Sequence, residues 1–214
     1  MRREGQRRAW PRLPGRQAPC RPAAPRSTGT APAAPARRRA APGQTDTWFM
    51  SSARAAEVEI RRASLADADQ VGVLAERVYR QGGWADERYS AQLLDGRSRV
   101  QDAIVLVAVS GGAIVGTITM ARPGTRFANV GRAGEAEVRM LAVDEAARGR
   151  GVADRLMGAC EALSRQDGLA AVVLSTEPDM HAAQRLYRRR GYVRQPDRDW
   201  SAGRSALLVY RLSL

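Results

Sequence analysis

The stretch EAEVRMLAVDEAARGRGVADRLMGACEA, residues 135–162, decides the fold of this 214-residue chain. Residues 136–143 form an apolar-rich run that is typical of a strand, and a polar turn follows over 144–147. The chain then passes through a glycine-rich corner into a helix, whose one apolar face holds Val152, Leu156, Ala159 and Leu163. The predicted local order is therefore strand, turn, glycine-rich corner and helix.

The glycine-rich corner has the properties of a phosphate-binding site. A helix N-terminus carries unpaired N–H groups and a partial positive charge. Gly149 and Gly151 leave no side chain in the way of these groups, and Arg148 and Arg150 add positive charge. A corner that only turns the chain is one alternative. A dinucleotide fingerprint is another, but Asp154 stands at the position of its third glycine, and the glycines come several residues after the strand. The sequence thus predicts a pyrophosphate cradle.

Two motifs in order carry a resemblance to a known family. Arg148-x-x-Gly151-x-Ala153, after a strand that ends in LAV, resembles the acetyl-CoA-binding motif of the GNAT superfamily of N-acyltransferases. The segment AQRLYRRRGY, residues 183–192, is similar to the helix that follows in that family and to its turn into a strand. The resemblance covers residues 58–214 and implies acetyl-CoA as co-substrate. The residues it assigns to acetyl-CoA binding are Leu141, Ala142, Val143, Arg148, Gly149, Arg150, Gly151, Val152 and Ala153.

The predicted fold class is α/β, with a mixed central sheet and helices on both faces, as the resemblance also implies. We expect the element order βααβββαβαββ in one domain over residues 57–214. The expected strands cover 58–62, 104–109, 113–121, 136–143, 170–175, 192–194 and 205–212, and the expected helices 64–79, 88–100, 152–163 and 181–190.

Two residues are candidates for the proton transfers of an acyltransferase. Alternation along the central strand would place Glu137, Arg139, Leu141 and Val143 on one face, and Glu137 matches the frequent strand glutamate of the family. We expect Glu137 to act as general base, directly or through water, and the alternative is an exposed acid balanced by Arg139. Tyr187 stands at the family's tyrosine position in Leu-Tyr-x-x-x-Gly and is the expected general acid, with a half-buried structural aromatic as the alternative.

The implied reaction moves an acetyl group from acetyl-CoA to a primary amine by direct attack. Small amines, amino-acid derivatives, antibiotics and peptide or protein N-termini all remain open as acceptors. The alternative function is a non-catalytic CoA-binding or regulatory domain. The chain departs from many family members after the fifth strand, where asparagine is common and this sequence has Thr176-Glu177-Pro178. Aromatic and acidic residues suited to a cationic acceptor are Trp84, Asp86, Glu87, Tyr89, Asp197, Asp199 and Trp200.

The N-terminal segment differs in composition from the rest of the chain. Residues 1–49 contain eight of the 11 prolines and eleven arginines against two acids, so +9 of the net +13 charge lies there. We expect residues 1–56 to form a disordered tail, and Met50 to be the true start if the preceding segment is not translated. A basic arm for nucleic acid is the alternative, but aromatic residues are scarce there, so nucleic acid is not the expected partner.

Other classes of site are not indicated. No apolar run is long enough to span a membrane, and no group of residues has metal-ligand spacing. The two cysteines, Cys20 and Cys160, do not suggest a disulfide framework. We therefore expect a cytoplasmic enzyme without a metal or a membrane partner, and a homodimer is left open.

Overall fold

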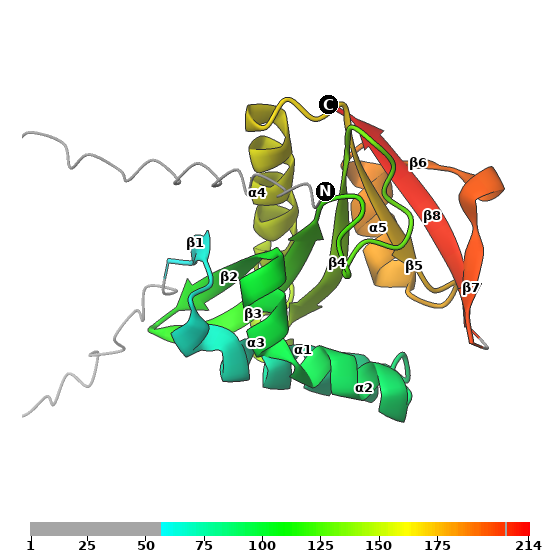
Figure 1. Cartoon of the computed structure of the whole chain (residues 1–214). Coiled ribbons are helices and arrows are strands. Elements are labelled where there is room, and N and C mark those ends of the chain that lie inside the picture. Colours follow the sequence, from blue (N-terminus) through cyan, green and yellow to red (C-terminus); the bar gives the residue numbers. More distant parts are fainter. Residues whose placement is uncertain (1–56, 204) are drawn as a thin grey trace, which may run out of the picture. The chain divides into compact units, whose positions relative to one another are not determined.

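The computed structural model of the chain describes residues 57–203 and 205–214. The expectations for the tail over residues 1–56 and for Met50 as the start lie outside the described residues. The described part forms one mixed sheet covered by helices, which confirms the predicted fold class (Figure 1).

The sheet has the strand order β1-β2-β3-β4-β5-β8-β6, and β7 pairs with β8 beside this path. Only the contact between β4 and β5 is parallel; the other pairs are antiparallel. The strands are β1 (Glu59–Arg62), β2 (Ile104–Ser110), β3 (Ala113–Ala121), β4 (Glu135–Val143), β5 (Ala171–Thr176), β6 (Val193–Arg194), β7 (Trp200–Ala202) and β8 (Ser205–Ser213).

The helices are α1 (Ala68–Gln81), α2 (Glu87–Leu94), α3 (Gly96–Asp102), α4 (Val152–Gln166) and α5 (His181–Arg189), with short 3-10 turns η1 (Leu65–Asp67), η2 (Glu145–Ala147) and η3 (Pro196–Arg198). The predicted helix over 88–100 is two helices, because Asp95 ends α2 and its carboxylate accepts the N–H of Ser98 at the start of α3. Together with the short strand β7, this adds two elements to the predicted order.

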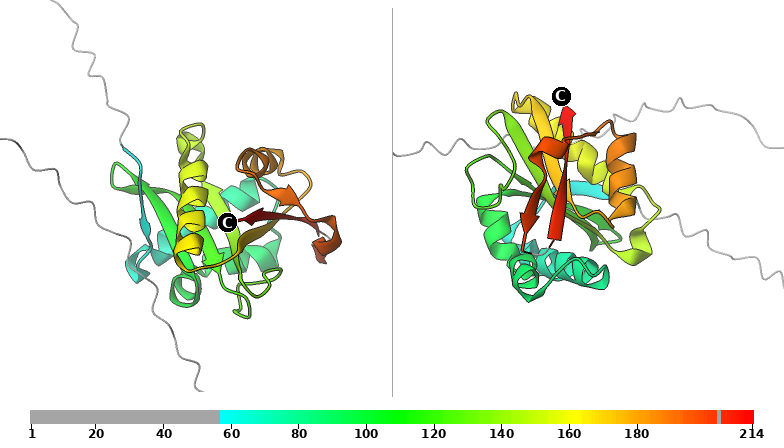
Figure 2. Two further views of the ribbon diagram at one scale, coloured as in Figure 1. Left: turned by 90° about the horizontal axis from the view of Figure 1, so that it is seen from above. Right: turned by 90° about the vertical axis from the view of Figure 1, so that its right-hand side faces the viewer.

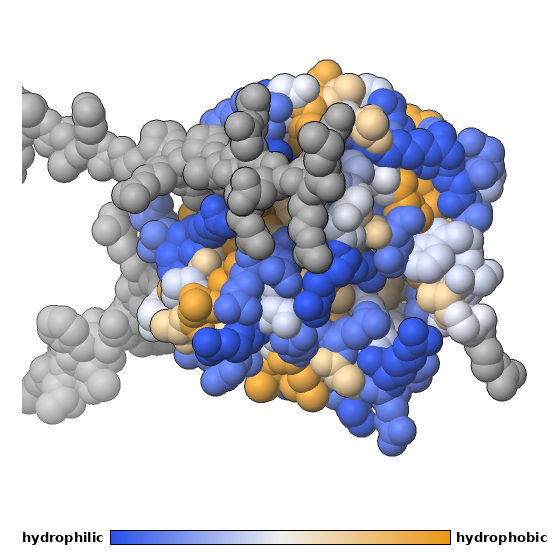
Figure 3. All heavy atoms as spheres, viewed as in Figure 1, coloured by the Kyte–Doolittle hydropathy of each residue, from blue (hydrophilic) through white to orange (hydrophobic). Residues whose placement is uncertain are grey.

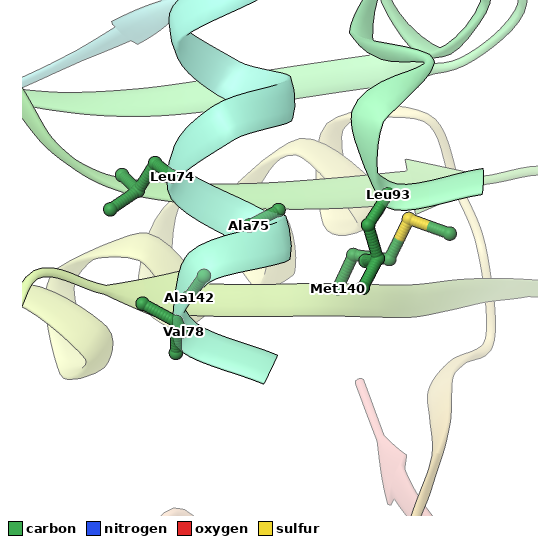
Figure 4. Packing of buried hydrophobic residues seen from close by; sticks show 6 residues of the cluster. All are labelled: Leu74, Ala75, Val78, Leu93, Met140 and Ala142. Atoms are coloured by element: carbon green, nitrogen blue, oxygen red, sulfur yellow. The ribbon is translucent and has the colours of Figure 1, made fainter. Parts of the chain in front are cut away.

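Helices α1 and α4 cover opposite faces of the sheet. On one face, Leu74, Ala75 and Val78 of α1 belong to one buried cluster with Met140 and Ala142 of β4 (Figure 4). Thr117 of β3 pairs with Ala142. Gly116, the residue before Thr117, faces the other side of the sheet. A Cβ added to Gly116 would lie 2.8 Å from the Val152 side chain of α4. Figure 2 shows the sheet between these helices from two further directions.

Strand β4 contains a bulge that changes which side chains share a face. Arg139 pairs with Thr119 and Ala142 with Thr117, so β4 has one residue more than β3 in this interval, and Met140 has a φ of 53°. Residues of β4 after the bulge therefore point to the face opposite to the one that strict alternation from Glu137 would give them.

The bulge corrects the predicted alternation along β4. Glu137 pairs with Ala121 and Val143 with Gly116, and these two partners lie five positions apart on β3. Glu137 and Val143 therefore point to opposite faces, so the prediction of a single shared face was wrong. A non-glycine residue with positive φ is not visible in a hydrophobic pattern.

No helix among residues 57–203 and 205–214 is long and apolar enough to cross a membrane. Within the same residues, no group of three or more His, Cys, Asp or Glu side chains is placed to hold a metal ion. The visible coloured surface in Figure 3 carries apolar patches that hydrophilic residues separate from one another.

Candidate functional site

The parallel strands β4 and β5 separate halfway along β4. They are paired from Glu135–Ala171 to Val138–Leu174, and β5 then continues to Thr176 paired with β8 alone. Beyond Val138, β4 is paired only with β3. The backbone of residues 139–143 therefore has no strand partner on the β5 side within the described part of the chain. This segment includes the three predicted backbone contacts Leu141, Ala142 and Val143.

The predicted cradle lies between the end of β4 and the start of α4. Gly149 and Gly151 both have a φ of 74°, and a Cβ on either would meet no atom within 4 Å. Glycine is thus required there by the backbone conformation rather than by lack of space. Arg148 and Arg150, which flank these glycines, are both exposed.

The N-terminus of α4 follows the exposed corner of residues 148–151. Its first backbone hydrogen bond joins the Arg155 N–H to the Gly151 carbonyl at 3.0 Å, so the N–H groups of residues 152–154 precede the helical ladder. Val152 is only 1% exposed and packs into the core, whereas Ala153 is half-buried and Gly151 is exposed. Positive-φ glycines, arginines and a free helix start together suit a phosphate group.

Glu137 is fully buried and anchors the connection between β3 and β4. Its Oε2 accepts the N–H groups of Asn129, Val130 and Gly131 at 2.7, 2.8 and 2.9 Å. Its Oε1 has no hydrogen-bond partner among the described residues and lies 3.8 Å from Nε of Arg139. The alternative of an exposed acid at this position is therefore wrong. A carboxylate in this setting holds a loop, and Oε1 is the oxygen that is left for a further hydrogen bond.

A cavity of about 860 Å³ opens beside the separated strands. Its wall includes both aromatic and charged side chains, and burial raises the pKa of both Tyr79 and Tyr89. Arg139 lies at this cavity and donates to the Phe127 carbonyl at 2.8 Å. We call it the acceptor cavity because the acceptor of the implied reaction is expected there, and its lining includes Tyr79, Trp84, Asp86, Arg88, Tyr89, Asp95, Arg126, Arg139, Glu177, Met180 and Trp200.

The sequence predicted part of this lining. Trp84, Asp86, Tyr89 and Trp200 line the acceptor cavity, whereas Glu87, Asp197 and Asp199 do not. Asp199 instead forms an ion pair with Arg194 at 2.7 Å.

Tyr187 lies at a second, smaller cavity of about 220 Å³. This cavity also contacts Leu141, where β4 has left β5, and it shares Tyr79, Trp84 and Met180 with the acceptor cavity. The Tyr187 side chain is only 6% exposed and burial raises its pKa. Its ring packs against those of Tyr192 and Tyr210. The predicted acid therefore lies next to the gap between the strands.

Glu177 is an acidic residue of the cavity that is not among the predicted site residues. It follows β5 directly, lines the acceptor cavity and is half-buried. Burial raises the pKa of its carboxyl, the nearby Asp179 raises it further, and a hydrogen bond with Ser205 opposes both. The signal was present in the sequence as an acid immediately after a buried strand, in place of the family's frequent asparagine.

Comparison with known proteins identifies the family of this domain. The sequence matches the model of the acetyltransferase (GNAT) family over residues 70–192. No curated protein matched it.

Three solved structures share the fold. The GNAT-family acetyltransferase from Staphylococcus aureus Mu50 has a TM-score of 0.60 and 14% identity, covering 74% of this chain and 99% of its own. The PaiA N-acetyltransferase from Thermoplasma acidophilum, solved with coenzyme A, has a TM-score of 0.58 and 15% identity, covering 73% and 99%. YncA from Salmonella typhimurium, a putative acetyltransferase solved with acetyl-CoA, has a TM-score of 0.53 and 20% identity, covering 73% and 94%.

Proposed function

The chain belongs to the acetyltransferase (GNAT) family, and from that premise we propose that it transfers an acetyl group from acetyl-CoA to a primary amine. The observation that carries this proposal is the separation of β4 from β5 next to the open N-terminus of α4. Structures of similar fold have been solved with coenzyme A and with acetyl-CoA.

The described residues fit acetyl-CoA as co-substrate. The corner of residues 148–151 and the first N–H groups of α4 would hold the pyrophosphate. The unpaired edge of β4 over residues 141–143 would hydrogen-bond the amide groups of the pantetheine arm, as an added strand does. A backbone N–H of this edge would also stabilise the negative charge on the thioester oxygen during transfer.

The transfer requires two proton movements on the acceptor side. A primary amine with a pKa of about 10 is mostly protonated near neutral pH, so a base has to remove one proton before the lone pair can attack. The C–N bond then forms and the C–S bond breaks. Tyr187 gives its proton to the leaving sulfur and regains one from the nitrogen, which becomes the amide.

Glu137 remains the base predicted from the sequence. Its Oε2 already accepts three N–H groups and its side chain has no exposed surface, so it would have to act through its second oxygen. In this role, Glu137 would receive the proton of the amine at Oε1 through a water molecule.

Calorimetry with acetyl-CoA, followed by a panel of amines assayed for release of free thiol, tests the proposed function. We expect acetyl-CoA to bind and at least one primary amine to release thiol in proportion to acetyl-amide formed. Binding of acetyl-CoA without turnover of any amine would favour the non-catalytic CoA-binding alternative, and lack of binding would refute both.

A further inference from the structure

Resting on the proposed function, we propose that Glu177 binds the ammonium group of the acceptor and takes its proton. Glu177 follows the last residue of β5, the strand that β4 has left, and its side chain lines the acceptor cavity. It therefore lies at the mouth of the strand gap, where the thioester and the acceptor have to meet.

The buried carboxylate of β4 is poorly suited to this role. Glu137 is 0% exposed, and its charge is already stabilised by three backbone N–H groups and by Arg139 nearby. Oε2 is thus already occupied by three donors, and no part of the carboxylate reaches the surface. Glu137 does not line the acceptor cavity, whereas Arg139 does.

The other carboxylates of the cavity wall are engaged elsewhere. Asp86 caps α2 by accepting the Tyr89 N–H at 2.8 Å. Asp95 caps α3 and forms an ion pair with Arg126 at 3.4 Å. The hydrogen bond with Ser98 lowers the pKa of Asp95, in the direction opposite to Glu177. Among the acids that line this cavity, Glu177 combines partial burial with a carboxyl whose proton affinity is raised.

The backbone of Glu177 is held in place. Its carbonyl accepts a hydrogen bond from the Met180 N–H at 3.2 Å. Nε2 of Gln184 donates to this same carbonyl at 3.1 Å and to the Pro178 carbonyl at 2.8 Å. Gln184 is itself only 5% exposed. A buried side chain thus fixes the turn that carries Glu177, which is the support that a reacting group needs.

The surroundings of Glu177 suit an organic ammonium ion. Aromatic faces attract cations, and the cavity wall contains Tyr79, Trp84, Tyr89 and Trp200. The other charged groups around the cavity are Asp86, Arg88, Asp95, Arg126 and Arg139, with Asp179 beside Glu177. We therefore assign the acceptor to primary amines that carry an apolar or aromatic group, of which phenethylamine is the simplest probe.

The bound ammonium group gives one proton to Glu177, and the freed lone pair forms the C–N bond while the C–S bond breaks. Tyr187 protonates the sulfur and takes the second proton of the nitrogen. Glu177 then releases its proton to solvent when the products leave.

The test compares Glu177→Gln with Glu137→Gln in the full chain. Turnover of phenethylamine is measured from about pH 6 to about pH 9, and calorimetry measures its binding to the protein saturated with CoA. We expect Glu177→Gln to lower kcat/KM by about 10²–10⁴-fold at neutral pH, with a loss that shrinks as pH rises because more amine is then neutral.

The two measurements separate this inference from the proposed function. Phenethylamine affinity should fall in Glu177→Gln and acetyl-CoA affinity should stay. Any loss of turnover in Glu137→Gln, which changes the side chain that holds the loop of residues 129–131, should be the same at every pH. A Glu177→Gln protein with unchanged turnover and amine affinity overturns the inference, as does a pH-dependent loss confined to Glu137→Gln. Amine binding that depends on Glu177 without any turnover upholds the amine site and refutes the transfer reaction.

Discussion

Oε2 of Glu137 lies 2.9 Å from the backbone nitrogen of Gly131 and accepts its N–H. The same oxygen accepts two further N–H groups from the preceding residues, so one side chain of β4 organises the end of the long connection from β3. Because this connection includes Phe127, whose carbonyl accepts from Arg139, the position of Arg139 at the acceptor cavity depends on Glu137.

Glu137→Ala should therefore destabilise the fold. Loss of a charged acceptor for three backbone N–H groups should lower the free energy of unfolding by about 1–3 kcal/mol. Urea denaturation measures it, with Glu145→Ala on the exposed η2 turn as a control that should change stability by less than about 0.5 kcal/mol. Equal stability of Glu137→Ala and the unsubstituted protein would contradict the anchoring role.

Gly151 offers the most direct test of the predicted cradle, because it is the N-cap residue of α4 and has a φ of 74°. Asn and Asp both tolerate this backbone region better than other side chains and have nearly the same shape. Gly151→Asp places a negative charge where phosphate should bind, so its acetyl-CoA affinity should fall by at least about tenfold relative to Gly151→Asn. Calorimetry measures both affinities, and circular dichroism checks that both variants fold.

Two results would count against the cradle. Equal acetyl-CoA affinity in Gly151→Asp and Gly151→Asn would show that no phosphate lies near this helix start. Binding of NADH in place of acetyl-CoA by the unsubstituted protein would favour the dinucleotide alternative.

The sequence predicted the elements around the cradle closely because their signals are local. The apolar-rich run predicts the strand, Gly149 and Gly151 predict the corner, and the apolar face after them predicts the helix. Each of these signals comes from neighbouring residues alone. The break between α2 and α3 was also readable in Asp95-Gly96, a turn signal that the helical pattern around it outweighed.

Long-range features of the site could not be predicted in this way. The bulge at Met140 depends on how β4 pairs with β3, and the burial of Glu137 depends on a connection that folds back over it. The position of Glu177 at the acceptor cavity depends on where β8, Trp84 and Tyr89 come together. These are properties of packing between distant segments, which local periodicity does not contain.

Glu135 should make stability depend on pH in the acidic range. Burial opposes its charge, but hydrogen bonds from Arg198, the Arg132 N–H and Arg211 outweigh it and lower the pKa from 4.5 to about 2. Because the pKa is lower in the folded state, Glu135 contributes stability above the unfolded value of 4.5. This contribution, about 3 kcal/mol, is lost as pH falls toward about 2.

Urea denaturation of Glu135→Gln and of the unsubstituted protein at several pH values measures this contribution. The variant should be less stable near neutral pH, also because Arg198 would lose its buried partner, and the gap should narrow below about pH 4. Glu145→Gln is the control with no expected gap. A gap that stays constant over the whole range would show that Glu135 titrates in the folded protein as it does in the unfolded chain.

Tyr187→Phe should show whether this buried phenol protonates the leaving thiolate. The change removes one hydroxyl and leaves the ring packing with Tyr192 and Tyr210 in place. Loss of a general acid should lower kcat by about 10²-fold or more, with little change in acetyl-CoA affinity. The defect should be smaller with an acetyl thioester of a more acidic thiol, because such a sulfur leaves without a proton donor.

Tyr192→Phe is the matched control, since its hydroxyl lies 3.2 Å from Glu161 and not at the strand gap. Its kcat should respond to the leaving thiol as the unsubstituted protein does, even if its stability falls. A Tyr187→Phe defect that stays the same for both thioesters would assign Tyr187 to packing rather than to proton transfer.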